Sequence, residues 1–167
     1  WLEHIRANPR NAPAVGGATD LELFLFGGAR VDLSAARAAL QDMQENRCFY
    51  CGSAMKQDPH VDHFIPWSRY PRDLAQNFVL AHGACNLDKG DMLGAPAHLA
   101  HWVKRNRELG PDLAARLSPA GFLDDQPAAL QVARWAYGQA EATEAQLWVS
   151  LKYTVNADGR CMEILSA

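Results

Sequence analysis

The 167-residue sequence lacks several features that would assign it to a protein class at once. It has no apolar run approaching the ~20 residues of a membrane helix, and its N-terminus shows no signal-peptide pattern. It contains no internal repeat and no low-complexity run, so a repeat architecture is not indicated. Because the chain begins at Trp1, we expect it to be a processed or excised piece.

Cysteine and positive charge are also scarce. The four cysteines are too few and too clustered for a disulfide framework, and they favour metal binding in a reducing, cytoplasmic compartment. Cys161 stands apart and is expected to be a free thiol. The formal net charge of −3 does not indicate nucleic-acid binding, because phosphate contacts normally come from an excess of basic residues.

Apolar periodicity predicts helices on both sides of a central stretch, within one compact domain. The N-terminal segment 1–47 is expected to be helical, with one helix over 32–44. Residues 19–26 fit a helix or a strand equally well. In the C-terminal segment 95–167, helices are predicted over 95–109, ended by Gly110-Pro111, then over 112–117 and over 128–151.

Two ligand pairs with the same internal spacing lie in the central stretch, 48–94. Cys48-x-x-Cys51 and His82-x-x-Cys85 offer three thiolates and one imidazole, a ligand set that closed tetrahedral zinc sites use. One such pair could simply be small buried apolar residues, but two pairs around a short segment favour zinc. The metal would be structural, joining the two ends of the stretch.

Between and after these pairs the sequence predicts strand, strand and helix. Residues 61–65 and 77–80 are short apolar runs that we expect to pair antiparallel, and the chain should turn helical from about residue 84. Asp62 and His63 are neighbours on the first strand and would point to opposite faces. The strand must therefore twist or break there, near Pro66, if both serve one site.

Four motifs occur in a fixed order over 48–89: C-x-x-C, D-H-x-x-P, N-F-V and C-N-x-x-K. In this order they resemble the HNH endonuclease family. The resemblance implies an α+β fold with a zinc-bound ββα-metal core, treble-clef-like, embedded in a mostly α-helical shell. It also implies hydrolysis of DNA phosphodiester bonds, leaving 3′-hydroxyl and 5′-phosphate ends. The chain looks like a small bacterial stand-alone protein of this family, for which phage defence is one setting.

The resemblance also implies roles for single residues. His63 would be the general base, a task that suits a side chain type that titrates near neutral pH. Asn77 would brace the loop and help to orient His63. Asp62 and Asn86 would hold the catalytic cation, and their oxygen ligands suit Mg²⁺ or Mn²⁺.

Contacts to the substrate are expected from basic residues of the same stretch. Lys89, Arg69 and Arg72 are candidates for contacting the phosphates of DNA, which we expect to be double-stranded. An additional domain or subunit could choose the target, and no membrane partner is expected. Two alternatives stay open: a non-catalytic zinc module that binds nucleic acid or a protein, and an RNA-directed nuclease.

Several residues near the motifs receive no catalytic role. Asp88 and Asp91 follow the site closely and are given none. His98 and His101 fit a solvated helix face, and Trp102 is expected to anchor the core.

Overall fold

The computed structural model describes residues 33–57 and 59–167. In chain order the described elements are α4 (Ser34–Met43), β1 (Pro59–His63), the short 3₁₀ helix η2 (Ala75–Asn77), β2 (Phe78–His82), α5 (Gly83–Lys89), α6 (Pro96–Leu117), the 3₁₀ helix η3 (Ser118–Ala120), α7 (Gln126–Ala142), β3 (Gln146–Ser150), β4 (Tyr153–Asn156) and α8 (Arg160–Ser166). The predicted α+β class is confirmed, and so is the strand–strand–helix order of the central stretch. The expectations for residues 1–32 lie outside the described residues.

The β1–β2 pair lies at the centre of the described structure. The two strands run antiparallel, with His63 opposite Phe78. Along β2 the side chains alternate between two hydrophobic cores: Phe78 and Leu80 enter one, and Val79 and Ala81 enter the other. A strand buried on both faces explains why this run is apolar without interruption.

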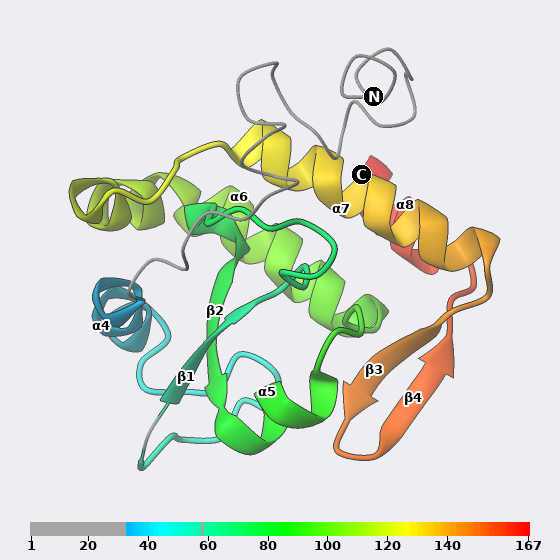
Figure 1. Ribbon diagram of the computed structural model, residues 1–167, viewed down its shortest axis with the longest axis horizontal. Helices are drawn as coiled ribbons and strands as arrows, with labels where there is room; N and C mark the ends of the chain where they lie inside the picture. Colours follow the sequence, from blue (N-terminus) through cyan, green and yellow to red (C-terminus); the bar gives the residue numbers. More distant parts are fainter. Residues whose placement is uncertain (1–32, 58) are drawn as a thin grey trace.

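Helices cover both cores. Ala36 and Leu40 of α4 meet Leu113 and Leu117 of α6 on the Phe78 side of the sheet. The first part of α6, together with α7 and β3, covers the other side. Figure 1 shows α6 behind the sheet, α4 at one side and the β3–β4 hairpin at the other. None of the helices within 33–57 and 59–167 is both long and apolar enough to cross a membrane.

The predicted helix break at Gly110-Pro111 is wrong, because α6 continues as one helix of 22 residues to Leu117. Proline is compatible with a helical φ, and its cost is one lost hydrogen bond and a local clash. A single buried face that includes Trp102, Leu113 and Leu117 extends along both halves of the helix. Packing of this face offsets the local cost of the proline.

The predicted helix over 128–151 is also wrong beyond Ala142, where α7 ends. The chain returns as β3, and the backbone N–H of Trp148 donates to the Leu93 carbonyl at 2.8 Å. The Trp148 carbonyl accepts from the Ala95 N–H, also at 2.8 Å. These bonds reach a segment more than fifty residues earlier, so a local periodicity does not encode them.

Candidate active site and zinc cluster

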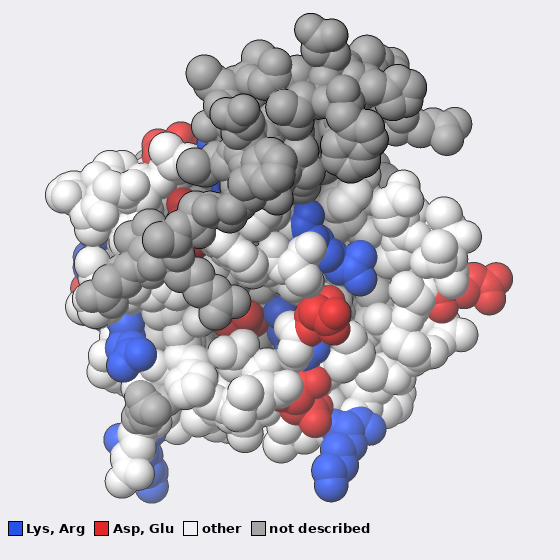
Figure 2. Space-filling model, viewed as in Figure 1, with Lys and Arg blue, Asp and Glu red and all other residues white. Residues whose placement is uncertain are grey.

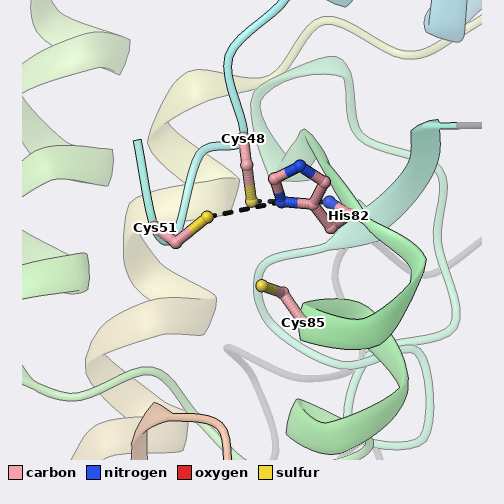
Figure 3. A group of neighbouring side chains, drawn as sticks. All are labelled: Cys48, Cys51, His82 and Cys85. Carbon is pink, nitrogen blue, oxygen red and sulfur yellow. Dashed lines mark hydrogen bonds between the residues drawn. The ribbon is translucent and has the colours of Figure 1, made fainter. Parts of the chain in front are cut away.

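All four predicted zinc ligands meet in one cluster. Cys48 and Cys51 come from the turn before β1, His82 ends β2, and Cys85 lies in the first turn of α5. Their ligand atoms all lie within 4.8 Å of one another, and Figure 3 shows the three sulfurs and the imidazole converging. The donor set fits a tetrahedral Zn²⁺ ion.

Local backbone geometry places these ligands. The Gly52 N–H donates to the Cys48 carbonyl at 2.9 Å, and the Cys48 N–H donates to the Ser53 carbonyl at 2.9 Å, which closes a tight turn. Gly52 has a φ of 68°, a conformation that glycine adopts at little cost. Because α5 begins immediately after His82, Cys85 lies one helical turn further on and faces the same point.

The cysteines differ in their readiness to lose a proton. Burial opposes ionisation of Cys51, but hydrogen bonds from the Ser53 backbone, Cys48 and His82 outweigh it and lower the pKa of Cys51 to about 7. Burial, reinforced by the negative charge of the neighbouring thiolates, raises the pKa of Cys85 to about 12. Zinc binding therefore requires the release of a proton from Cys85, since zinc is held by thiolates.

A cavity of about 380 Å³ lies beside β1. We call it the β1 cavity, and it is lined by Leu33, Val61, Asp62, His63, Pro66, Trp67, Ser68, Asp73, Asn86, Gly90 and Asp91. Three of the four residues predicted for catalysis, Asp62, His63 and Asn86, thus share one cavity. The described part of its lining includes three aspartates and no lysine or arginine, and carboxylate oxygens are ligands that hard divalent cations prefer.

Asp62 and His63 reach this cavity although they point to opposite faces of the sheet. The register places Asp62 opposite Val79, which faces one core, and His63 opposite Phe78, which faces the other. Within the described residues β1 pairs only with β2, and three consecutive residues of the strand, Val61, Asp62 and His63, line the cavity. The strand also ends at His63, in line with the expected break.

Residues 48–92 match the family model described as HNH endonuclease. This chain carries an HNH segment. The segment contains the zinc cluster and the three catalytic candidates of the β1 cavity, so the resemblance is confirmed and a nuclease-type function is indicated. No curated protein and no solved structure matches the chain.

Within the HNH segment, Asp62 is held by two buried partners. The Tyr50 hydroxyl donates to Asp62 Oδ2, and the Lys89 ammonium lies 3.0 Å from the same oxygen. Burial, then the nearby Asp62 charge, raises the pKa of Tyr50 well above its usual value, so Tyr50 stays a donor. Lys89 is 0 % exposed and faces Asp62 instead of solvent; its role in substrate binding stays a prediction.

His63 has a carboxylate partner that sequence reasoning missed. Its Nε2 lies 2.8 Å from Asp73 Oδ1, and its ring meets the rings of Trp67 and Phe78 edge-on. A carboxylate only accepts, so Nε2 carries the proton and Nδ1 of the neutral ring keeps its lone pair. Asp73 lies in an irregular loop and belongs to none of the motifs, so nothing in the sequence distinguished it from other loop aspartates.

Asn77 lies in η2 instead of at the start of β2, and it is buried outside the β1 cavity. Its side-chain oxygen accepts from the Ile65 N–H at 2.8 Å, and its amide donates to the Ile65 carbonyl at 2.9 Å. Its own carbonyl accepts from the Phe64 N–H at 2.8 Å. These three bonds fix the residues that follow His63, and an effect on the orientation of His63 stays a prediction.

A buried arginine of α6 supports η2 in turn. Arg105 donates to the carbonyls of Phe78 and Gln76, each at 2.6 Å, and Trp102 Nε1 donates to the Gln76 carbonyl at 2.9 Å. Burial lowers the pKa of Arg105 to about 10, so the guanidinium remains charged at neutral pH. The helical shell thereby fixes the turn that carries the bracing asparagine.

The two loop arginines lie near the cavity but do not line it. Trp67 and Ser68 of the same loop reach the β1 cavity, whereas Arg69 and Arg72 do not. Arg72 contacts the Tyr70 hydroxyl at 3.3 Å. Contacts of these arginines with DNA phosphates stay a prediction.

Two residues near the motifs dock the β3–β4 hairpin. His98, predicted on a solvated face, is half-buried: its Nε2 lies 2.8 Å from the Val149 carbonyl and its ring stacks on Trp148. Asp88, which had no assigned role, accepts from Trp148 Nε1 at 2.8 Å and from the Lys152 N–H at 2.9 Å.

The expectation for Trp102 is confirmed, since it is fully buried, and Cys161 is a free buried thiol, as expected.

Proposed function

We propose that this protein is a metal-dependent endonuclease that hydrolyses DNA phosphodiester bonds in the β1 cavity. The observation that carries the proposal is that Asp62, His63 and Asn86 line one cavity within the HNH segment. A non-catalytic zinc module would need neither a histidine base nor oxygen ligands at that place.

Asp62 and Asn86 would hold the catalytic cation. Both offer oxygen, and the β1 cavity is otherwise acidic, which suits Mg²⁺ or Mn²⁺. When bound, the cation would contact the scissile phosphate and stabilise the charge that develops on the leaving oxygen.

His63 would act as the general base. Since Asp73 accepts the Nε2 proton, Nδ1 would take a proton from the attacking water, and Asp73 would stabilise the imidazolium that forms. Water would attack phosphorus and the bond to the 3′ oxygen would break. The products would carry 3′-hydroxyl and 5′-phosphate ends.

The substrate in this proposal is double-stranded DNA. On the face drawn in Figure 2, the basic side chains of the described residues are scattered and do not form one continuous patch. Arg69 and Arg72 would supply local phosphate contacts, and an additional domain or subunit would provide further affinity and the choice of target. A bacterial, cytoplasmic setting such as phage defence, with the protein on the nucleoid when bound, belongs to the same proposal.

A plasmid assay tests the proposal. Supercoiled DNA is incubated with the zinc-loaded protein, with and without Mg²⁺ or Mn²⁺, beside a His63→Ala variant and a His101→Ala control outside the cavity. We expect nicking or linearisation that requires the added cation, persists in the control and falls at least 100-fold in His63→Ala, the usual scale for a general base. Cleavage that His63→Ala retains would contradict the proposed base, and preferential cleavage of matched RNA would reassign the substrate.

A further inference from the structure

Tyr50 lies between two zinc ligands, Cys48 and Cys51, yet its hydroxyl reaches the predicted cation ligand. The side chain is 8 % exposed, and its hydroxyl donates to Asp62 Oδ2. The turn that holds the zinc thus also contacts Asp62, which lines the β1 cavity. Twelve residues separate the donor and the acceptor in sequence, so the contact depends on how the turn is folded.

The second partner of Asp62 comes from the other zinc-binding segment. Lys89 lies one helical turn after Cys85 on α5, and its ammonium is 3.0 Å from Asp62 Oδ2. It also donates to the His63 carbonyl at 3.2 Å, which holds the backbone directly after His63. The ammonium lies 5.8 Å from the centre of the Tyr50 ring, so the two partners of Asp62 also contact each other.

Both contacts fall on one oxygen of the carboxylate. Among the described residues, Tyr50 and Lys89 bind Oδ2, which leaves Oδ1 of Asp62 for a further ligand. A carboxylate held in one rotamer binds a cation without first losing side-chain freedom. Partners that orient a metal ligand in this way commonly change metal affinity or activity by about 10–100-fold when they are removed.

We propose that Tyr50 is a positioning residue that holds Asp62 for the catalytic cation and so couples the zinc cluster to the cation site. This inference rests on the proposed function, since it takes Asp62 as a cation ligand. The coupling has a direction: the zinc ligands fix the turn, the turn fixes the Tyr50 hydroxyl, and the hydroxyl fixes the carboxylate.

A purely structural role for Tyr50 makes a different prediction. Its ring packs edge-on against Phe49, His98 and Trp148, and a phenylalanine would keep these contacts. Tyr50→Phe therefore removes the hydroxyl alone. Tyr137→Phe is the matched control, because Tyr137 is fully buried and its hydroxyl donates to the Gly94 carbonyl at 2.7 Å, away from Asp62.

The test measures Mn²⁺ binding to the full zinc-loaded chain by electron paramagnetic resonance, with zinc content determined in the same samples. We expect Tyr50→Phe to keep its zinc and to bind Mn²⁺ about 10–100-fold more weakly, and Tyr137→Phe to match the wild type. Equal Mn²⁺ affinity in Tyr50→Phe and wild type would overturn the inference. Asp62→Asn tests the proposed cation site separately from the role of Tyr50: if this variant binds Mn²⁺ as well as the wild type does, the proposed cation site itself is wrong.

Discussion

At the scale of single residues, the His63–Asp73 contact determines which nitrogen is available to a substrate water. Asp73 Oδ1 lies 2.8 Å from Nε2, and the two side chains are 14 % and 12 % exposed. In a pair this sheltered, a carboxylate selects the tautomer of the ring. An asparagine of the same shape could donate to the ring instead and would favour the other tautomer.

We therefore expect Asp73→Asn to slow cleavage by at least tenfold, a part of the ~100–10,000-fold that a general base contributes. The half-saturating cation concentration should change little, because Asp62 keeps both of its partners. Single-turnover rates at several Mn²⁺ concentrations separate the two effects. Asp112→Asn, an exposed change on α6, serves as the control, and a wild-type rate in Asp73→Asn would contradict the assigned role.

At the scale of elements, the β3–β4 hairpin is docked on α5 through one carboxylate. The Trp148 indole N–H, then the Lys152 backbone N–H, lower the pKa of Asp88. A group whose pKa is lowered on folding stabilises the folded form above its unfolded pKa, about 3.9 for aspartate, and that contribution is lost as the pH falls through the lower, folded value. The docking should therefore be constant at neutral pH and weaken only in acid.

Asp88→Asn should loosen the hairpin already at neutral pH and remove the acid-dependent step. Hydrogen exchange at the β3 and β4 amides, with the Trp148 indole N–H followed by nuclear magnetic resonance, measures both effects. Asp91 lies three residues after Asp88 and is exposed, so the hairpin amides of the control variant Asp91→Asn should exchange as in the wild type. Unchanged protection of the hairpin in Asp88→Asn would show that the backbone hydrogen bonds of Trp148 with Leu93 and Ala95 are sufficient to dock the hairpin, and would contradict the role given to Asp88.

The elements that the sequence predicted correctly are those encoded locally. Ligand spacing identified the zinc cluster, and short apolar runs identified β1 and β2 to within two residues. The β3 strand was missed because its pairing with the 93–95 backbone is a long-range contact, and the same holds for Asp73 and Tyr50. The side chain of Asp73 reaches the site because its loop packs against β1, and that of Tyr50 because the zinc-binding turn does. Neither arrangement produces a periodic pattern in the sequence.

At the scale of the whole molecule, the shell and the HNH segment stabilise each other. The cores on the two faces of β2 contain residues of α4, α6, α7 and α8, so a disordered β1–β2 pair would leave these helices without a buried partner. The pair is in turn fixed at one end by the zinc cluster. Structural zinc contributes about 10–16 kcal/mol in isolated zinc fingers, as much as the ~5–15 kcal/mol of net stability of a typical domain.

Loss of zinc should therefore unfold the whole protein and not the HNH segment alone. Cys85→Ala should lose its zinc and its cooperative thermal unfolding transition, as should the wild type treated with a strong chelator. Cys161→Ala is the matched control: Cys161 is also buried but lies outside the cluster, and its truncation should cost about 1 kcal/mol with zinc retained. Metal analysis and calorimetry measure both. A cooperative transition that survives in zinc-free Cys85→Ala would show that the helical shell folds independently of the metal.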